Sequence, residues 1–301
     1  MTHAVTLDRR RVAALVIASA IGLALFLWPL WIDAESDLAH SGDAAVMFAV
    51  VVAMLIVVLA AEISHDGLDA KALALLGILA ALAAALRPLG SGISGFQPMF
   101  VVLIIGGRVL GPGFGFALGL VSMFGSALLT GGVGPWLPFQ MLGAAWLGMG
   151  AGLLPRASGK VEVALLAGYG AVSGILYGFL MNMWFWPFLT STQEGIGFVP
   201  GDSIANNLGR FFVFCLVTSL GFDIPRAIGN VLIISFAGGA LLRSLRRVSR
   251  KASFDATAVF RSPQALDEEA SSIVPTQSDS SDSHAHSSSS ASGSEHSNGD
   301  P

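Results

Sequence analysis

Residues 99–129 read MFVVLIIGGRVLGPGFGFALGLVSMFGSALL and contain a single charged side chain, Arg108. The tripeptide GPG at 111–113 divides this run into two apolar stretches, 99–110 and 114–129. Proline lacks an amide hydrogen and glycine adopts turn conformations readily, so the tripeptide predicts a tight turn between two helices. Two nearly uncharged helices joined in this way are typical of a protein that lies in a membrane.

The composition of the whole chain points the same way. Of its 301 residues, 53% are hydrophobic and only 12% are charged, whereas roughly 25% are charged in an average soluble domain. The mean hydropathy is +0.71. So few polar side chains cannot cover a water-exposed surface, which excludes most soluble enzyme classes. The single cysteine, Cys215, excludes a disulfide framework and a cysteine-based metal site.

The chain divides into three expected regions. About 20 apolar residues cross a bilayer, because a helix rises 1.5 Å per residue. Residues 1–66 form a basic start followed by a transmembrane hairpin, 67–251 form a membrane core, and 252–301 form an acidic, serine-rich tail that we expect to be disordered. The apolar segments are 12–31, 44–63, 72–86, 99–110, 114–129, 137–154, 163–180, 204–220 and 227–242.

The number of spanning segments follows from the basic residues at both ends. Residues 9–11 and the cluster at 243–251 both belong in the cytoplasm under the positive-inside rule, which requires an even number of spans in the cytoplasmic membrane. We expect 204–220, which starts with polar residues, to be the segment that does not cross. The short segment 99–110 is the alternative. A cleaved signal peptide competes with the first span, although no clear cleavage site follows it.

Residues that would support catalysis are missing from the membrane core. No histidine lies between Asp66 and Ser283, which excludes a Ser–His nucleophile pair there, and no ATP-binding Walker loop is present. We therefore expect no enzyme, no cofactor and no bound metal. Uphill transport by this chain would require energy from another subunit. The mildly basic body lacks a nucleic-acid-binding motif, so no nucleic acid is expected.

Small residues at four-residue spacing mark several segments. Glycines and alanines in 107–119, 144–152 and 170–178 predict close backbone packing within the chain. The segment 72–86 differs because alanines leave it with a smooth face. These alanines are Ala80, Ala81, Ala84 and Ala85. Such a face can pack inside the bundle or dock another membrane subunit, and spacing alone does not distinguish the two.

Polar and aromatic side chains gather toward the expected outer ends of the segments. The candidate ligand-binding residues are Phe96, Gln97, Trp136, Gln140, Asn182, Trp184, Asn206 and Arg210. Aromatic faces bury planar ligands and amides fix their edges. An interfacial aromatic belt explains Trp184 equally well, whereas Gln140 and Asn182 lie where polar side chains usually face a cavity or a partner.

Two arginines lie beside Pro and Gly breaks. For Arg108 and Arg226 we expect side chains that extend to the lipid head groups. Asp223 is also placed to pair with Arg226 at the start of the last helix.

The stretch 72–247 resembles the substrate-binding S components of energy-coupling factor (ECF) transporters, the vitamin-uptake branch of ABC transporters. Besides the alanine segment and the glycines of 107–119, the resemblance rests on GFQP at 95–98, GPWLPFQM at 134–141, and TSLGFD at 218–223 followed by RAIGN at 226–230. The PWLPFQM block is similar to the group that includes cobalamin-type S components.

This resemblance implies a six-helix core with an outward-facing site for a vitamin-like ligand. It also implies that the alanine face docks on a transmembrane T component that carries two ATPase subunits. The N-terminal hairpin and the acidic tail depart from the minimal family pattern. The alternative function is a membrane scaffold or assembly protein that transports nothing.

Overall fold

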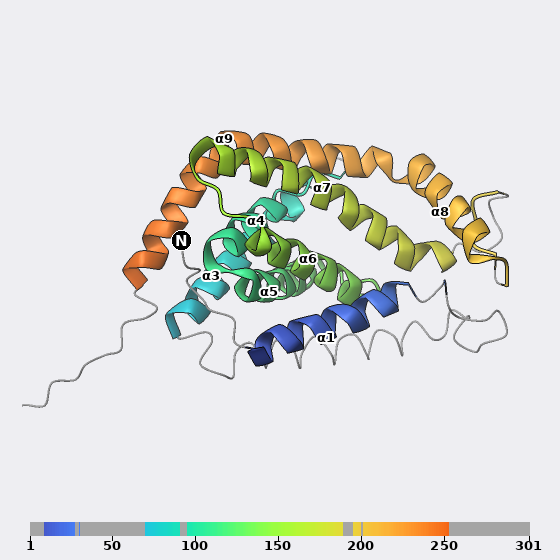
Figure 1. The fold of residues 1–301 in the computed structure, drawn as a ribbon, viewed down its shortest axis with the longest axis horizontal. Coiled ribbons are helices and arrows are strands. Elements are labelled where there is room, and N and C mark those ends of the chain that lie inside the picture. Colours follow the sequence, from blue (N-terminus) through green and yellow to red (C-terminus); the bar gives the residue numbers. More distant parts are fainter. Residues whose placement is uncertain are drawn as a thin grey trace, which may run out of the picture. The chain divides into compact units, whose positions relative to one another are not determined.

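The computed structural model describes residues 9–27, 30, 70–90, 95–188, 195–199 and 201–252, all within the unit Met1–Asp255. Every regular element in this part of the chain is helical (Figure 1). The helices are α1 (Arg9–Phe26), α3 (Ala70–Leu86), α4 (Met99–Leu110), α5 (Pro112–Thr130), α6 (Leu137–Leu153), α7 (Gly159–Phe185), α8 (Ile204–Thr218) and α9 (Leu220–Ala252), with short 3-10 turns at Pro88–Gly90 and Trp186–Phe188.

The protein is a polytopic all-α membrane protein, as the sequence predicts. Four stretches in the described part are long and apolar enough to cross a bilayer: Lys71–Gly90, Pro112–Thr130, Gly159–Phe185 and Leu220–Arg250. Shorter apolar helices are Val12–Phe26, Met99–Leu110 and Ile204–Thr218. The predicted segment 44–63 and the predicted tail 253–301 lie outside the described residues. That 204–220 does not span stays a prediction.

Helix α4 lies at the centre of the bundle. Every residue of α4 except Val102 is buried, and the helix packs against α3, α5, α6, α7 and α9. A helix surrounded by other helices needs apolar residues on all sides, which explains why its sequence shows no polar face. Protein rather than lipid therefore covers this short helix.

Glycines bring α4, α5 and α6 into backbone contact. A Cβ atom at Gly107 or at Gly115 would collide with the backbone carbonyl of Gly148, and one at Gly119 would collide with the backbone of Ala144. Side chains at these positions would force the three helices apart. The close intrachain packing predicted from the four-residue spacing is confirmed for this region.

The connection between the last two helices differs from the prediction. We expected a connector at 221–226, but α9 begins at Leu220 and contains Pro225, so only Ser219 separates it from α8. The amides of Phe222 and Asp223 both donate to the Ser219 carbonyl, at 2.8 and 2.9 Å, and start the new helix at once. Asp223 in the first turn also suits the positive end of the helix dipole.

Arg108 does not extend to the lipid head groups, so that prediction was wrong. Its Nε atom lies 2.7 Å from Oε1 of Glu162, and its Nη1 atom donates to the Leu154 carbonyl at 2.9 Å. The Nη2 atom of Arg246 lies 2.7 Å from the same Glu162 oxygen. The physical reason is that Arg108 lies in the last turn of α4. This helix is central, so other helices surround the Arg108 side chain. We call Arg108, Glu162 and Arg246 the Glu162 triad.

Candidate functional site

The first turns of α9 carry a buried ion pair. Nη1 of Arg226 lies 2.6 Å from Oδ1 of Asp223 and donates to the Gly174 carbonyl of α7 at 3.0 Å. Only 7% of Arg226 and 5% of Asp223 are exposed. The predicted pairing is therefore confirmed, while the expectation that Arg226 reaches the lipid head groups was wrong. The cause is Gly178 of α7, where any Cβ atom would collide with the Asp223 carboxylate, so the glycine makes room for the pair.

Tyr177 of α7 lies beside this ion pair. The guanidinium carbon of Arg226 is 5.5 Å from the centre of the Tyr177 ring, which suits a cation–π contact. The Phe100 ring of α4 meets the same ring edge-on, with centroids 4.8 Å apart. On α6, a Cβ atom at Gly143 would lie 3.1 Å from the Tyr177 ring. Side chains or backbone of α4, α6 and α9 thus surround Tyr177, which is buried.

A second arginine approaches Tyr177 from the end of α3. Nη2 of Arg87 donates to Oε1 of Gln140, in the first turn of α6, at 3.0 Å. Its partner Gln140 lies about one helical turn before Gly143, the α6 position that faces the Tyr177 ring. Arg87 is half-buried, and its one hydrogen-bonded side-chain partner among the described residues is a neutral amide. We call Arg87, Gln140, Tyr177, Asp223 and Arg226 the Tyr177 cluster.

The segment 95–98 packs against the part of α9 that contains Arg226. Gly95 has a φ of +74°, and a Cβ atom there would collide with the Phe222 backbone. The Phe96 ring covers Gly229, where a Cβ atom would lie 2.6 Å from it. On α9, Phe222 lies about one helical turn before Arg226, and Gly229 lies about one turn after it. The tight contacts on both sides hold this segment against the first turns of α9.

Two buried polar atoms in this region have no hydrogen-bond partner among the residues that the structure describes. They are Oε1 of Gln97, an acceptor, and Nε of Arg226, a donor. A buried polar group without a partner costs about 1–3 kcal/mol. Such atoms therefore indicate a place where another molecule, water or ligand, supplies the missing partners.

Asn182 is tied to the junction of α8 and α9. Its Nδ2 atom donates to the Ser219 hydroxyl and to the Cys215 sulfur, the latter at 3.3 Å. Because Ser219 also accepts the amides that start α9, Asn182 lies next to the Asp223 end of the cluster. Of the predicted binding residues, Phe96, Gln97, Gln140 and Asn182 are thus at or beside the Tyr177 cluster.

The two predicted tryptophans lie elsewhere. Trp184 is buried in an apolar group that includes Phe26 and Phe139, and its ring centroid is 5.2 Å from that of Phe139. Trp136 is 41% exposed, and its indole nitrogen donates to the Gly132 carbonyl at 3.3 Å. The structure places both rings in surroundings that differ from those of Tyr177, which belongs to the central core.

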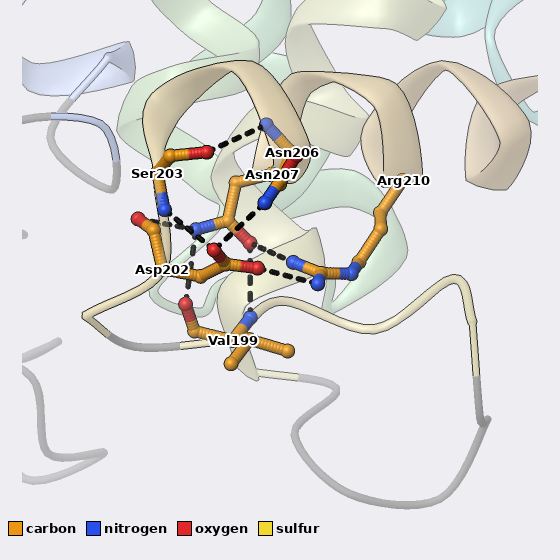
Figure 2. Close-up of polar contacts among 6 residues, drawn as sticks. All are labelled: Val199, Asp202, Ser203, Asn206, Asn207 and Arg210. Carbon is orange, nitrogen blue, oxygen red and sulfur yellow. Dashed lines mark hydrogen bonds and ion pairs between the residues drawn. The ribbon is translucent and has the colours of Figure 1, made fainter.

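Asn206 and Arg210 form a separate polar network at the start of α8 (Figure 2). The Asp202 carboxylate accepts from Nδ2 of Asn206 at 2.9 Å, from Arg210 and from the Ser203 amide at 2.7 Å. These hydrogen bonds lower the pKa of Asp202 to about 2. Asn207 binds both backbone groups of Val199, at 3.1 and 2.9 Å. The network fastens the segment before α8 to that helix and uses the polar groups of Asn206 and Arg210 to do so.

The four alanines proposed for docking are divided between two faces of α3. Ala80 and Ala84 are buried, with 4% and 3% exposed, and the Ala84 Cβ lies 3.7 Å from the position of a Cβ at Gly125 of α5. Ala81 and Ala85 are exposed. Only the second pair is accessible to another subunit.

Sequence reasoning missed Arg87 and Tyr177 as members of a site. The available signal for Tyr177 was its position between Gly174 and Gly178, where the missing side chains let Arg226 and Asp223 of α9 come close to α7. We interpreted that glycine series as packing alone. Arg87 gave no signal, because its partner Gln140 is 53 residues away in the sequence.

Comparison with known proteins gives one match. Residues 71–237 match the family described as ECF transporter, substrate-specific component. The matched region begins in α3 and ends within α9, so it contains the whole Tyr177 cluster. No curated protein and no solved structure matches the chain.

Proposed function

The chain belongs to the family of substrate-specific components of ECF transporters, and from this premise we propose that it captures a vitamin on the outer side of the cytoplasmic membrane. The family makes it a substrate-binding transporter subunit. The proposal adds the kind of ligand, the side on which it binds, and the place on the chain. Both termini are cytoplasmic in this proposal, as the basic residues at each end favour.

The proposed ligand site is the Tyr177 cluster together with Gln97 and Asn182. The observation that carries this proposal is the pair of buried, unpartnered atoms, Oε1 of Gln97 and Nε of Arg226. A substrate-binding subunit needs polar groups that bind the ligand and not one another, because groups already paired inside the protein have little to offer. Asn206, Arg210, Trp136 and Trp184 are secondary candidates, because they lie in surroundings that contain neither of these two unpartnered atoms and their polar groups or rings have partners within the chain.

The proposed partners are a T component and two ATPase subunits. Smooth faces let membrane helices approach closely, and Ala81 and Ala85 form such a face on the exposed side of α3. We narrow the docking face to this pair because Ala80 and Ala84 are covered by the chain itself. The N-terminal region 1–66, the core 67–251 and the tail 252–301 remain the proposed division into domains.

The test of the function is uptake of labelled vitamins in cells. Cells that produce the full chain with a T component and ATPases should accumulate one vitamin, whereas cells that produce the chain alone should not. Gln97→Leu should reduce uptake, and Leu176→Ala, on an exposed position of α7, serves as the control. Energised uptake by the isolated chain in vesicles would contradict the handover to ATPase subunits.

The docking face has its own test. Ala81→Trp should prevent co-purification with the T component while the purified chain keeps its thermal stability, because the new side chain points away from the bundle. Ala80→Trp is the contrasting variant, since it overfills the buried side and should lower stability by about 1–3 kcal/mol. Normal co-purification of the Ala81→Trp chain would refute docking through this face.

A further inference from the structure

We propose that the ligand of this site carries a single carboxylate, which binds between Arg87 and the free Nε of Arg226, and a hydrogen-bond donor that reaches Gln97. This inference rests on the proposed function and specifies its substrate class. It is carried by the charges of the Tyr177 cluster and by the polar atoms that the fold leaves without partners.

The formal charges of the Tyr177 cluster do not cancel. The cluster contains two arginines and one aspartate, so its formal charge is +1 when Tyr177 is neutral. Asp223 is 2.6 Å from Arg226 and compensates that arginine. No carboxylate of the described residues lies within ion-pair distance of Arg87. A half-buried cation in low-polarity surroundings is stabilised by one negative charge, and a carboxylate supplies one.

Both arginines of the cluster have N–H donors left for a ligand. Arg226 is held by Asp223, the Gly174 carbonyl and the Tyr177 ring, which fixes its guanidinium but leaves Nε without a partner. Arg87 uses Nη2 on Gln140. The two arginines are linked through packing contacts: Gln140, the partner of Arg87, lies about one helical turn before Gly143, and a Cβ atom at Gly143 would lie 3.1 Å from the Tyr177 ring that faces Arg226. Guanidinium groups bind carboxylates through short, charge-assisted hydrogen bonds.

A phosphate monoester does not match the charge of the Tyr177 cluster. Such a group carries nearly two negative charges at neutral pH, and it would leave an excess negative charge beside Asp223, which is only 5% exposed. A carboxylate leaves the buried site neutral. Oε1 of Gln97 is an acceptor, so it calls for a hydroxyl or N–H group elsewhere on the same ligand.

The experiment measures binding to the full chain, purified in detergent without transporter partners. Matched pairs that differ only in the acid group serve as probes: nicotinate and nicotinamide, pantothenate and panthenol, biotin and biotin amide. Cyanocobalamin, which lacks a free carboxylate, and thiamine, a cation, complete the panel. We expect one acid to bind, and its neutral analogue to bind about 10- to 100-fold more weakly, the effect of losing a hydrogen bond to a charged group.

Variants of Arg87 identify the cause. Arg87→Gln should weaken binding of the acid about 10- to 100-fold and leave the weak binding of its neutral analogue unchanged, while Arg87→Lys should retain part of the affinity. Arg156→Gln is the matched control, because it removes an exposed guanidinium at the far end of α6. Thermal stability of each variant without ligand shows whether it is folded.

The outcomes separate this inference from the proposed function. If a neutral or cationic vitamin binds best, or if Arg87→Gln weakens the acid and its analogue equally, the function stands and the carboxylate inference is overturned. If no compound of the panel binds, the proposed vitamin-binding function fails and the inference fails with it.

Discussion

Two clusters of buried charge that share helices α7 and α9 differ in how their polar groups are paired. In the Glu162 triad, Glu162 accepts hydrogen bonds from Arg108 and Arg246, and no buried side-chain atom of this triad lacks a partner. In the Tyr177 cluster, Nε of Arg226 has no such partner in the described part of the chain. Glu162 and Tyr177 are separated by about 22 Å along α7, from the helical rise. A network in which every polar group is paired holds helices together. A network with an unpaired polar group can still bind a ligand.

The largest expected effect comes from breaking the Glu162 triad. Glu162→Leu would leave Arg108, whose side chain is 6% exposed, without its anionic partner. Removing one member of a buried pair costs about 3–5 kcal/mol. Unfolding of the purified chain in micelles measures this loss. Arg246→Gln should cost less, because its side chain is 24% exposed. If Glu162→Leu unfolds like the unaltered protein, the triad is not what holds these helices together.

A smaller but more informative effect is expected at the Tyr177 cluster. Gly178→Ala places a Cβ atom where the Asp223 carboxylate lies and must displace the ion pair. We expect a loss of about 1–3 kcal/mol together with loss of ligand binding. Gly168→Ala is the control on the same helix, since a Cβ atom there meets nothing within 4 Å. It should leave binding intact and slightly favour the helix. Undiminished binding by Gly178→Ala would remove the ion pair from the site.

The smallest effect concerns the Asp202 network, which resembles the Glu162 triad in being fully paired but lies near the surface. The folded pKa of about 2 is below the ordinary value of 3.8. The stabilisation is therefore present above about pH 4 and is lost as the pH falls toward 2. Amide hydrogen exchange of residues 195–210 should be constant from pH 8 to about 5, after correction for intrinsic rates. At lower pH it should rise. Asp202→Asn should exchange faster at all these pH values, and an unchanged rate would contradict the network.

Much of the helical framework was predictable from local patterns. The break at Gly111–Gly113 and the four-residue glycine spacing act between neighbours in the sequence, so composition and period were sufficient. The pair Asp223–Arg226 was also predictable, because residues three apart on a helix share a face. The connector before α9 was predicted wrongly, because the charged residues Asp223 and Arg226 interrupt the apolar pattern although they lie within the first turns of the helix.

The site was less predictable because its contacts are distant in the sequence. Amides inside apolar segments marked Gln97, Gln140 and Asn182, since such groups rarely lie in a membrane without a reason. The hydrogen-bond partners in the site are determined by packing between segments that are far apart in the sequence. Arg87 is 53 residues from Gln140, and Arg226 is 52 residues from Gly174. Arg108 was misread for the same reason, because Glu162 is 54 residues away.

The junction at Ser219 gives this protein a built-in reporter. Asn182 holds Ser219 and also donates to Cys215, the chain's sole thiol, one turn earlier on α8. A spectroscopic label on this natural cysteine would stand beside the point from which α8 and the 33-residue α9 diverge. Rearrangement of the α7–α9 contact during ligand capture would change the signal of such a label without any engineered mutation.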